Sequence, residues 1–284
     1  MSRFVYADHA ATTRLSDAAL QAMLPYWKER YGNPSSLYAF AQQSKSDLEA
    51  ARAQVAACLH AAPEEIFFTS GGTEADNWAL KGAAELRRAK GRHIITTAIE
   101  HHAILHTAQY LEKRGYEVTY LPVDGDGLVT PEQVRAALRP DTILVSVMAA
   151  NNEIGTIEPI PAIGAVCRAA GVLFHTDAVQ AVGHIPVDVE QWQVDLLSLS
   201  GHKFYGPRGT GALYVRKGLR LPPLIYGGGQ ERGRRSGTEN VAGAVGLAAA
   251  LKEAVEGLPA ESERLATLRD RVLGGLPALP YAKV

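Results

Sequence analysis

Short apolar runs alternate with longer segments whose apolar residues recur at helical spacing through most of the chain. Strands are expected at residues 65–69, 93–97, 116–123, 142–148, 172–176, 194–199 and 210–215. Helices are expected at residues 46–59, 73–90, 103–114, 160–170, 241–256 and 261–273. A further helix begins with Thr130 as its cap and Pro131 at its first position. The run at 142–148 is almost continuously apolar, which is typical of a strand covered on both faces.

This alternation predicts a three-layer α/β/α fold with a mainly parallel sheet between two layers of helices. Polar residues follow several of the expected strands directly. They are Gly71-Gly72-Thr73, Glu100-His101-His102, Asn151-Asn152-Glu153, Asp177 and Ser200-Gly201-His202-Lys203. Ligands of such sheets bind at the carboxyl ends of the strands, so we expect these side chains to form one site.

The composition adds little that is specific. Of the 284 residues, 46% are hydrophobic and 21% are charged, as in ordinary globular proteins, and the net charge is −1. This balance does not favour nucleic acid or a membrane as a partner. The first residues contain no apolar core of a signal peptide, so we expect a cytoplasmic protein.

The cysteines and the histidine pair do not indicate a metal site. Cys58 and Cys167 have no CxxC neighbour and lie in expected helices, which favours buried thiols. His102 and His106 are four residues apart, a spacing found in metal sites, but no third ligand is evident. A pair on a helix surface is the favoured interpretation, and no metal is predicted.

The turn at Gly71, Gly72 and Thr73 joins an expected strand to an expected helix. Glycines let the backbone approach a ligand closely, and free N–H groups at a helix start attract phosphate. A tight turn with Thr73 as the helix cap explains the same residues, so both interpretations stay open.

Lys203 and Asp177 suggest pyridoxal 5'-phosphate (PLP). Lys203 follows an apolar strand, where a desolvated amine can condense with an aldehyde as a Schiff base. Asp177 can keep a pyridine nitrogen protonated. The alternatives are a solvated surface lysine and an aspartate that caps the next segment. Ser200 and His202 could contact a phosphate, Gln180 the phenolic oxygen, and His101 the ring face.

A glycine-rich basic loop spans residues 227–238. It can bind an anion or cross to another subunit, or it can be a solvated connection.

Taken together, these segments resemble the cysteine desulfurases of the NifS/IscS type, which are fold-type I PLP enzymes of the class V aminotransferase group. The matching motifs are residues 10–13 (AATT), 32–36 (GNPSS), 69–74 (TSGGTE), 100–103 (EHHA), 151–155 (NNEIG), 175–180 (HTDAVQ), 200–207 (SGHKFYGP) and 235–238 (RSGT). They appear in the family's order across almost the whole chain.

The resemblance implies a role for each matching residue. Lys203 would bind the cofactor covalently and His101 would stack on its ring, as the catalytic pair. Asp177 would pair with the ring nitrogen, and Gln180 and Asn152 would contact the cofactor's oxygen or the substrate. The phosphate would be held by Gly72, Thr73, Ser200 and His202. Thr238 would reach the cofactor of a second subunit, which implies a homodimer.

The implied reaction converts L-cysteine to L-alanine and leaves the sulfur as an enzyme persulfide for iron–sulfur cluster assembly or thiolation. A sulfur-acceptor protein, such as an iron–sulfur scaffold, is therefore an expected partner. His9 stands where the family usually has Asn. Family members continue past Val284 through a small domain that carries the nucleophilic cysteine, and neither Cys58 nor Cys167 matches it.

We therefore expect a C-terminally truncated member with three parts. Residues 1–15 form an N-terminal segment, residues 16–256 a PLP-binding large domain, and residues 257–284 the start of the small domain. The run from 279 to 284 is expected to begin another strand. The alternatives are another class V enzyme (a selenocysteine lyase or a small-amino-acid aminotransferase) and a catalytically silent PLP-fold scaffold.

Overall fold

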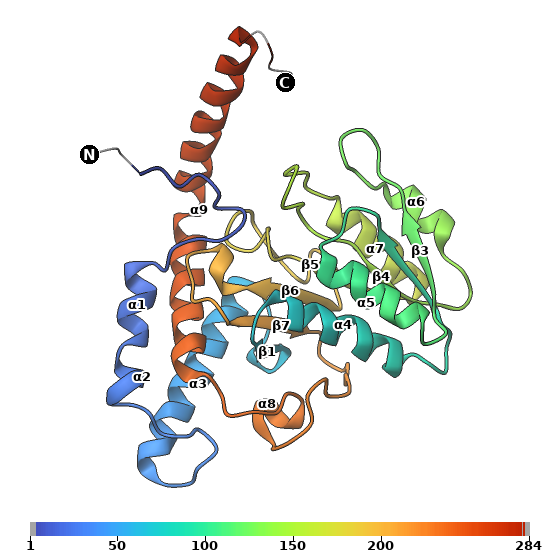
Figure 1. Ribbon diagram of the computed structural model, residues 1–284. Helices are drawn as coiled ribbons and strands as arrows, with labels where there is room; N and C mark the ends of the chain where they lie inside the picture. The colour runs from blue at the N-terminus through green and yellow to red at the C-terminus, as the bar shows by residue number, and fades with distance from the viewer. Residues whose placement is uncertain (1–3, 280, 282–284) are drawn as a thin grey trace.

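A seven-stranded sheet lies between two layers of helices in the computed structural model, which describes residues 4–279 and 281 (Figure 1). The strand order is β1-β7-β6-β5-β4-β2-β3. The strands are β1 (Ile66–Thr69), β2 (His93–Thr97), β3 (Glu117–Leu121), β4 (Thr142–Ser146), β5 (Leu173–Asp177), β6 (Leu196–Ser200) and β7 (Gly211–Val215). The predicted fold class is confirmed, because all seven expected strands are present and most neighbours pair in parallel.

The helices alternate with the strands through the middle of the chain. They are α1 (Asp17–Met23), α2 (Pro25–Lys28), α3 (Ala39–Cys58), α4 (Gly72–Leu86), α5 (His102–Glu112), α6 (Pro131–Ala137), α7 (Ile160–Ala170), α8 (Gln230–Gly233) and α9 (Val241–Gly275). Short 3-10 turns lie at Pro63–Glu65, Gly201–Lys203 and Leu276–Ala278. The predicted cap of α6 is present, since the Thr130 hydroxyl accepts a hydrogen bond from the Gln133 amide.

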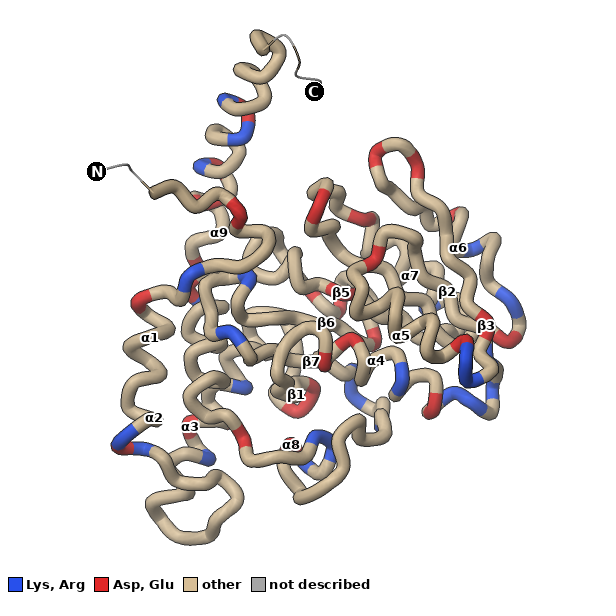
Figure 2. The backbone as a smooth tube through the Cα atoms, viewed as in Figure 1, with Lys and Arg blue, Asp and Glu red and all other residues tan. Residues whose placement is uncertain are grey.

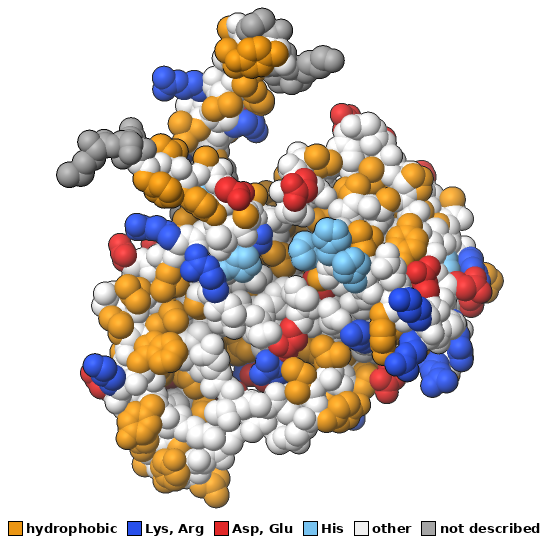
Figure 3. Space-filling model, viewed as in Figure 1, with side chains coloured by type: hydrophobic (Ala, Val, Ile, Leu, Met, Phe, Trp, Pro, Cys, Tyr) orange, Lys and Arg blue, Asp and Glu red, His pale blue; other side chains and the backbone are white. Residues whose placement is uncertain are grey.

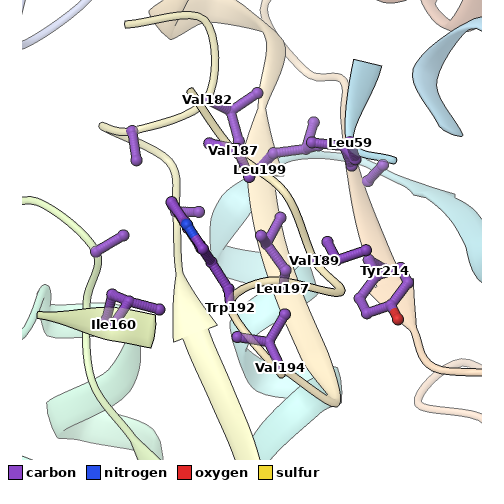
Figure 4. Close-up of a cluster of buried hydrophobic side chains, with 14 of the residues drawn as sticks. Leu59, Ile160, Val182, Val187, Val189, Trp192, Val194, Leu197, Leu199 and Tyr214 are labelled. Atoms are coloured by element: carbon purple, nitrogen blue, oxygen red, sulfur yellow. The ribbon is translucent and has the colours of Figure 1, made fainter. Parts of the chain in front are cut away.

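Alternate residues of each strand point to opposite faces and build two separate cores. On one face, Phe67, Ile94 and Leu144 pack with residues of α4 and α5. On the other face, Val145 and Leu197 join α3, α6, α7 and α9. Figure 4 shows part of this second core, in which the Trp192 ring lies among the labelled side chains Leu59, Ile160, Val182, Val187, Val189, Val194, Leu197, Leu199 and Tyr214.

The sheet itself is almost free of charge, and Lys, Arg, Asp and Glu lie mainly on helices and loops (Figure 2). β1, β4, β6 and β7 contain no charged residue. In the described part of the chain, no helix is both long and apolar enough to cross a membrane.

Two antiparallel pairings set the direction of the edge strand β1. β7 runs antiparallel to both β6 and β1, so β1 has the same direction as β4, β5 and β6. The carboxyl ends of these four strands therefore meet at one edge of the sheet. Gly211 pairs with both Thr69 and Ser200, the last residues of β1 and β6, which brings the two following turns together.

The C-terminal helices differ from the sequence prediction. The structure contains a single helix, α9, where separate helices at 241–256 and 261–273 were expected, and Pro259 lies inside it. The residues around Pro259 are largely exposed, so water can satisfy the carbonyl that proline leaves unpaired, and strong helix formers flank it on both sides. The end of α9 extends beyond the sheet and its helices (Figure 1).

Two further differences concern local elements. The patterns predicted neither α1 nor α2, and α3 begins at Ala39 rather than at residue 46. The expected strand at 279–284 lies mostly outside the described residues, and Leu279 and Tyr281, which are described, are not in a strand.

Candidate active site

A cavity of about 490 Å³ opens at the edge where β1, β4, β5 and β6 end. It is lined by nine of the ten residues that the sequence assigned to a cofactor site: Gly72, Thr73, His101, Asn152, Asp177, Gln180, Ser200, His202 and Lys203. Histidine side chains gather on the upper middle of the face seen in Figure 3. The convergence expected from the polar residues after the strands is therefore present.

The start of α4 presents unpaired amides to this cavity. Its N-cap is Gly71, at a positive φ of 149°, and no side chain of the described residues caps the helix. Among the described residues, no hydrogen bond uses the amides of Gly72, Thr73 or Glu74. A second cavity of about 430 Å³ shares Gly72, Thr73, Ser200 and His202 with the first. Free helix amides beside hydroxyl groups are suited to a phosphate.

Lys203 lies in the 3-10 turn that directly follows β6. Its Nζ donates hydrogen bonds to the carbonyl oxygens of Ala10 and, at 3.0 Å, of Ala11. Burial lowers the pKa of Lys203, although the charges of Asp177, Asp8 and Glu153 oppose this shift. The environment therefore shifts Lys203 toward the neutral amine, which is the form that attacks a carbonyl.

Asp177 is the last residue of β5, and its side chain is buried. Its Oδ1 accepts a hydrogen bond from the Val179 amide at 2.9 Å. Burial raises the pKa of Asp177, while the Val179 amide, His101 and Lys203 lower it. A buried carboxylate with one free oxygen toward a cavity can pair with a protonated ring nitrogen.

His101 and His202 line the cavity from different elements of the fold. His101 is the N-cap of α5, where its Nδ1 accepts a hydrogen bond from the Ala103 amide at 3.1 Å. His202 Nδ1 lies 3.0 Å from Thr12 Oγ1. Burial, together with the charges of Lys203 and Arg208, lowers the pKa of His202.

The amide side chains of Gln180 and Asn152 also line the cavity, and each donates a hydrogen bond to a neighbouring lining residue. Gln180 Nε2 donates to the Ala10 carbonyl oxygen at 2.9 Å, and Asn152 Nδ2 donates to Glu153 Oε1 at 2.7 Å. Residues 8–11 therefore form a wall of the cavity that joins Lys203 and Gln180.

Thr238 is the one predicted site residue that the structure does not place in the cavity. It is exposed and lines neither of the two adjoining cavities. Its loop is nevertheless fixed to the site, because Arg235 donates two hydrogen bonds to Glu74 of α4, at 2.8 and 3.0 Å. A single chain does not test a contact with a second subunit, so the role of Thr238 stays a prediction.

The same loop is held from the other side by a buried ion pair. Arg52 of α3 donates two hydrogen bonds to Glu231, at 2.8 and 2.9 Å, and both side chains are nearly inaccessible. Glu231 also accepts the Phe68 amide of β1 and adopts a positive φ of 46°. The loop is therefore anchored to the fold at Glu231 and Arg235, while most of its other residues are exposed.

Asp76 of α4 is a cavity residue that the sequence interpretation missed. Its carboxylate, that of Asp177 and a ring nitrogen of His101 all lie within 4.8 Å of one another. Its position could have indicated this, since Asp76 follows Gly72 by four residues and so shares its helix face.

The remaining candidates lie away from the cavity. The His102 and His106 rings are 5.2 Å apart and exposed on α5, and no third metal-ligating side chain joins them within the described residues. Cys167 is buried and Cys58 is half-buried, and neither lines the cavity.

These features define an α/β protein with a lysine, a buried aspartate and the amides of a helix start at one sheet edge, and the chain belongs to the aminotransferase class-V family, whose model matches residues 5–284. It is 55% identical over 285 residues to the cysteine desulfurase IscS of Clostridium botulinum, covering 100% of this chain and 72% of that relative. The predicted resemblance is confirmed.

Two solved structures share the fold. A NifS-like protein matches with a TM-score of 0.96 and 46% identity, over 98% of this chain and 77% of that one. SspA in complex with cysteine matches with a TM-score of 0.86 and 43% identity, over 88% and 72% of the two chains.

Proposed function

We propose that this chain binds PLP and acts as a cysteine desulfurase that converts L-cysteine to L-alanine and passes the sulfur to a thiol. The observation that carries the proposal is the meeting of the Lys203 amine, the Asp177 carboxylate and the free amides of α4 in one cavity. Class V aminotransferases and the cysteine desulfurases among them depend on PLP, which confirms the predicted cofactor.

The donor set fits PLP group by group. The amides at the start of α4, with Thr73 and Ser200, are suited to the phosphate. Asp177 is suited to the ring nitrogen, and Lys203 to the aldehyde carbon. His101 stands within 4.8 Å of Asp177, where it can cover a ring held by that carboxylate. When bound, PLP supplies an electron-withdrawing ring to the α carbon of an amino acid.

Lys203, Asp177 and His101 would each bind or transfer a different proton of the reaction. With PLP bound, Lys203 Nζ would be the group that accepts the proton of the substrate α carbon, because burial lowers its pKa and so shifts it toward the neutral amine. Asp177 would hold a proton on the ring nitrogen, and His101, which lines the same cavity, would be a second proton carrier.

The sulfur step balances as a transfer between thiols. L-cysteine and a thiol R–SH give L-alanine and the persulfide R–S–SH, as the carbon–sulfur bond of the substrate breaks and a sulfur–sulfur bond forms. Neither Cys58 nor Cys167 lines the cavity, and burial raises the pKa of Cys167 to about 12. We therefore assign the acceptor role to neither of them, and an added thiol serves as acceptor in the assay.

The proposal includes partners and organisation. L-cysteine as substrate agrees with the cysteine complex of the related SspA. We further propose a cytoplasmic homodimer in which Thr238 reaches the partner's cofactor, and an iron–sulfur scaffold as sulfur acceptor. The proposed parts remain residues 1–15, 16–256 and 257–284, with the last boundary inside α9.

The experiment measures alanine formed from L-cysteine by PLP-loaded protein in the presence of dithiothreitol. We expect alanine and sulfide in equal amounts. We also expect a visible absorbance that disappears on treatment with borohydride, which should leave the cofactor covalently attached to the Lys203 peptide as a label. Lys203→Ala should lose both the label and the alanine. A borohydride label that persists in Lys203→Ala would falsify the lysine assignment.

The same assay separates the alternatives. Pyruvate from alanine and a 2-oxo acid indicates an aminotransferase, and selenide from selenocysteine without sulfide from cysteine indicates a selenocysteine lyase. A bound, reducible cofactor with no product from any of these substrates indicates a scaffold.

A further inference from the structure

A second carboxyl group, that of Asp76, lies beside Asp177 in the polar core under the cavity. Asp76 is 1% exposed and Asp177 is 5% exposed. They belong to different elements, since Asp76 lies in the second turn of α4 and Asp177 ends β5. Their carboxylate oxygens lie within 4.8 Å of each other, and both residues line the cavity.

Apart from His101, whose ring nitrogen lies within 4.8 Å, the described groups around Asp76 supply no compensating positive charge. His175 Nε2 lies 3.7 Å from Asp76 Oδ1, but burial lowers the pKa of His175 to about 3, so its ring is neutral. The His175 ring is already engaged by Ser146 and Ser198, at 2.9 and 3.0 Å. Glu100, which raises the pKa of Asp76 further, is itself a buried acid.

Two adjacent buried carboxyl groups cannot both ionise at little cost, so one of them keeps a proton. Asp177 has the Val179 amide on its Oδ1 and feels the charges of Lys203 and His101, all of which favour its ionised form. Asp76 Oδ1 is buried and has no hydrogen-bond partner among the described residues. Burial and the Asp177 charge raise the pKa of Asp76 well above its usual range, and Ser198 opposes this only in part.

We propose that Asp76 is a positioning residue that holds the shared proton of this pair and so keeps the neighbouring Asp177 ionised and oriented toward the cofactor ring. This inference rests on the proposed function, because it gives Asp177 the ring nitrogen as its partner. Asp76 itself touches neither substrate nor cofactor in this role.

Two variants of nearly the same shape test it. Asp76→Asn is uncharged and can still donate a hydrogen bond, so it mimics the protonated acid, whereas Asp76→Leu keeps the branched shape and removes the donor. We expect PLP-loaded Asp76→Asn to match the parent protein in PLP affinity and in the pH profile of the visible absorbance. Asp76→Leu should bind PLP about tenfold or more weakly and show a shifted pH profile.

Other results overturn the proposal. If Asp76→Asn binds PLP as weakly as Asp76→Leu, the carboxylate of Asp76 is ionised in the native protein. If both variants match the parent protein, Asp76 only fills space. Thermal unfolding of all three proteins identifies a variant that has failed to fold.

One measurement is independent of the proposed function. The infrared carbonyl band of a protonated carboxyl group, recorded without PLP, should lose intensity in Asp76→Asn, with Glu100→Gln as the matched control for the other buried acid. If the band is unchanged in Asp76→Asn, Asp76 carries no proton in the native protein and the proposal is wrong. A parent protein that binds no PLP contradicts the proposed function, and this band still reports on Asp76.

Discussion

Replacement of Glu100 by Gln removes a buried acid that should make the protein less stable as the pH rises. Glu100 lies between β2 and α5 and is 5% exposed. Its Oε1 accepts hydrogen bonds from Thr97 Oγ1 at 2.8 Å and from the Met148 amide at 2.9 Å. Burial, which outweighs these two hydrogen bonds, raises the pKa of Glu100 to about 8.

The sign of the effect follows from proton binding. An unfolded Glu loses its proton near pH 4.3, whereas folded Glu100 keeps it up to a pH of about 8. Between these values the folded state binds more protons, so the free energy of unfolding falls by about 1.4 kcal/mol per pH unit. The full free energy of unfolding is present at low pH, where Glu100 is protonated in both states, and this contribution is lost as the pH rises toward the pKa of folded Glu100.

The variant should lack this slope. Glu100→Gln cannot titrate, and the amide oxygen of its new side chain can accept the same two hydrogen bonds from Thr97 and Met148. The free energy of unfolding of Glu100→Gln minus that of the parent protein should rise by about 2.7 kcal/mol between about pH 5.5 and pH 7.5.

Urea denaturation of both proteins at the two pH values, with the same PLP loading, measures this difference. Glu263→Gln, which changes an exposed side chain of α9, is the control for removal of a surface carboxylate. A difference between Glu100→Gln and the parent protein that is the same at both pH values refutes the reasoning, because Glu100 would then be ionised in the folded state.

Three further predictions concern stability and reactivity. Glu231→Ala removes the buried partner of Arg52 and leaves it only the half-exposed Glu49, so urea denaturation should show a loss of about 3 kcal/mol, part of which Arg52→Met restores in the double variant; no recovery contradicts the pairing. Gly164→Ala places a methyl group in collision with the Trp192 carbonyl oxygen and should cost about 1–3 kcal/mol or more, whereas an unchanged melting temperature contradicts this close packing. Iodoacetamide should modify Cys167 only after unfolding, because its thiol is fully buried and its pKa is raised to about 12; peptide mapping of folded protein that shows rapid labelling is the contrary result.

The sequence predicted the sheet well because burial on two faces leaves a clear apolar pattern. Residues 160–170 form α7 with the expected bounds, and His93–Thr97 forms β2 as expected. The direction of β7 was not accessible, since a buried antiparallel strand has the same apolar composition as a parallel one. The continuity of α9 through Pro259 was missed because local propensity indicates a break there.

The site was predictable to the extent that its residues follow strands. Asp177 and Ser200 end their strands, Lys203 lies in the turn after one, and all three line the cavity. Asp76 does not, because it lies on a helix and has a role only through a neighbour that is distant in sequence. The wall formed by residues 8–11 likewise depends on long-range hydrogen bonds, which no local pattern encodes.

The position of β1 has a consequence for how the polypeptide assembles. Among the described strands, β1 comes first in the chain, yet its only partner in the sheet is β7, which comes last of them. A nascent chain must therefore keep this apolar segment, and the glycine turn that follows it, without a docking place until nearly all of the sheet has emerged from the ribosome. Pairing between segments so distant in sequence slows folding and leaves apolar strand residues exposed to aggregation in the meantime. The growing chain should therefore need chaperone protection during this interval.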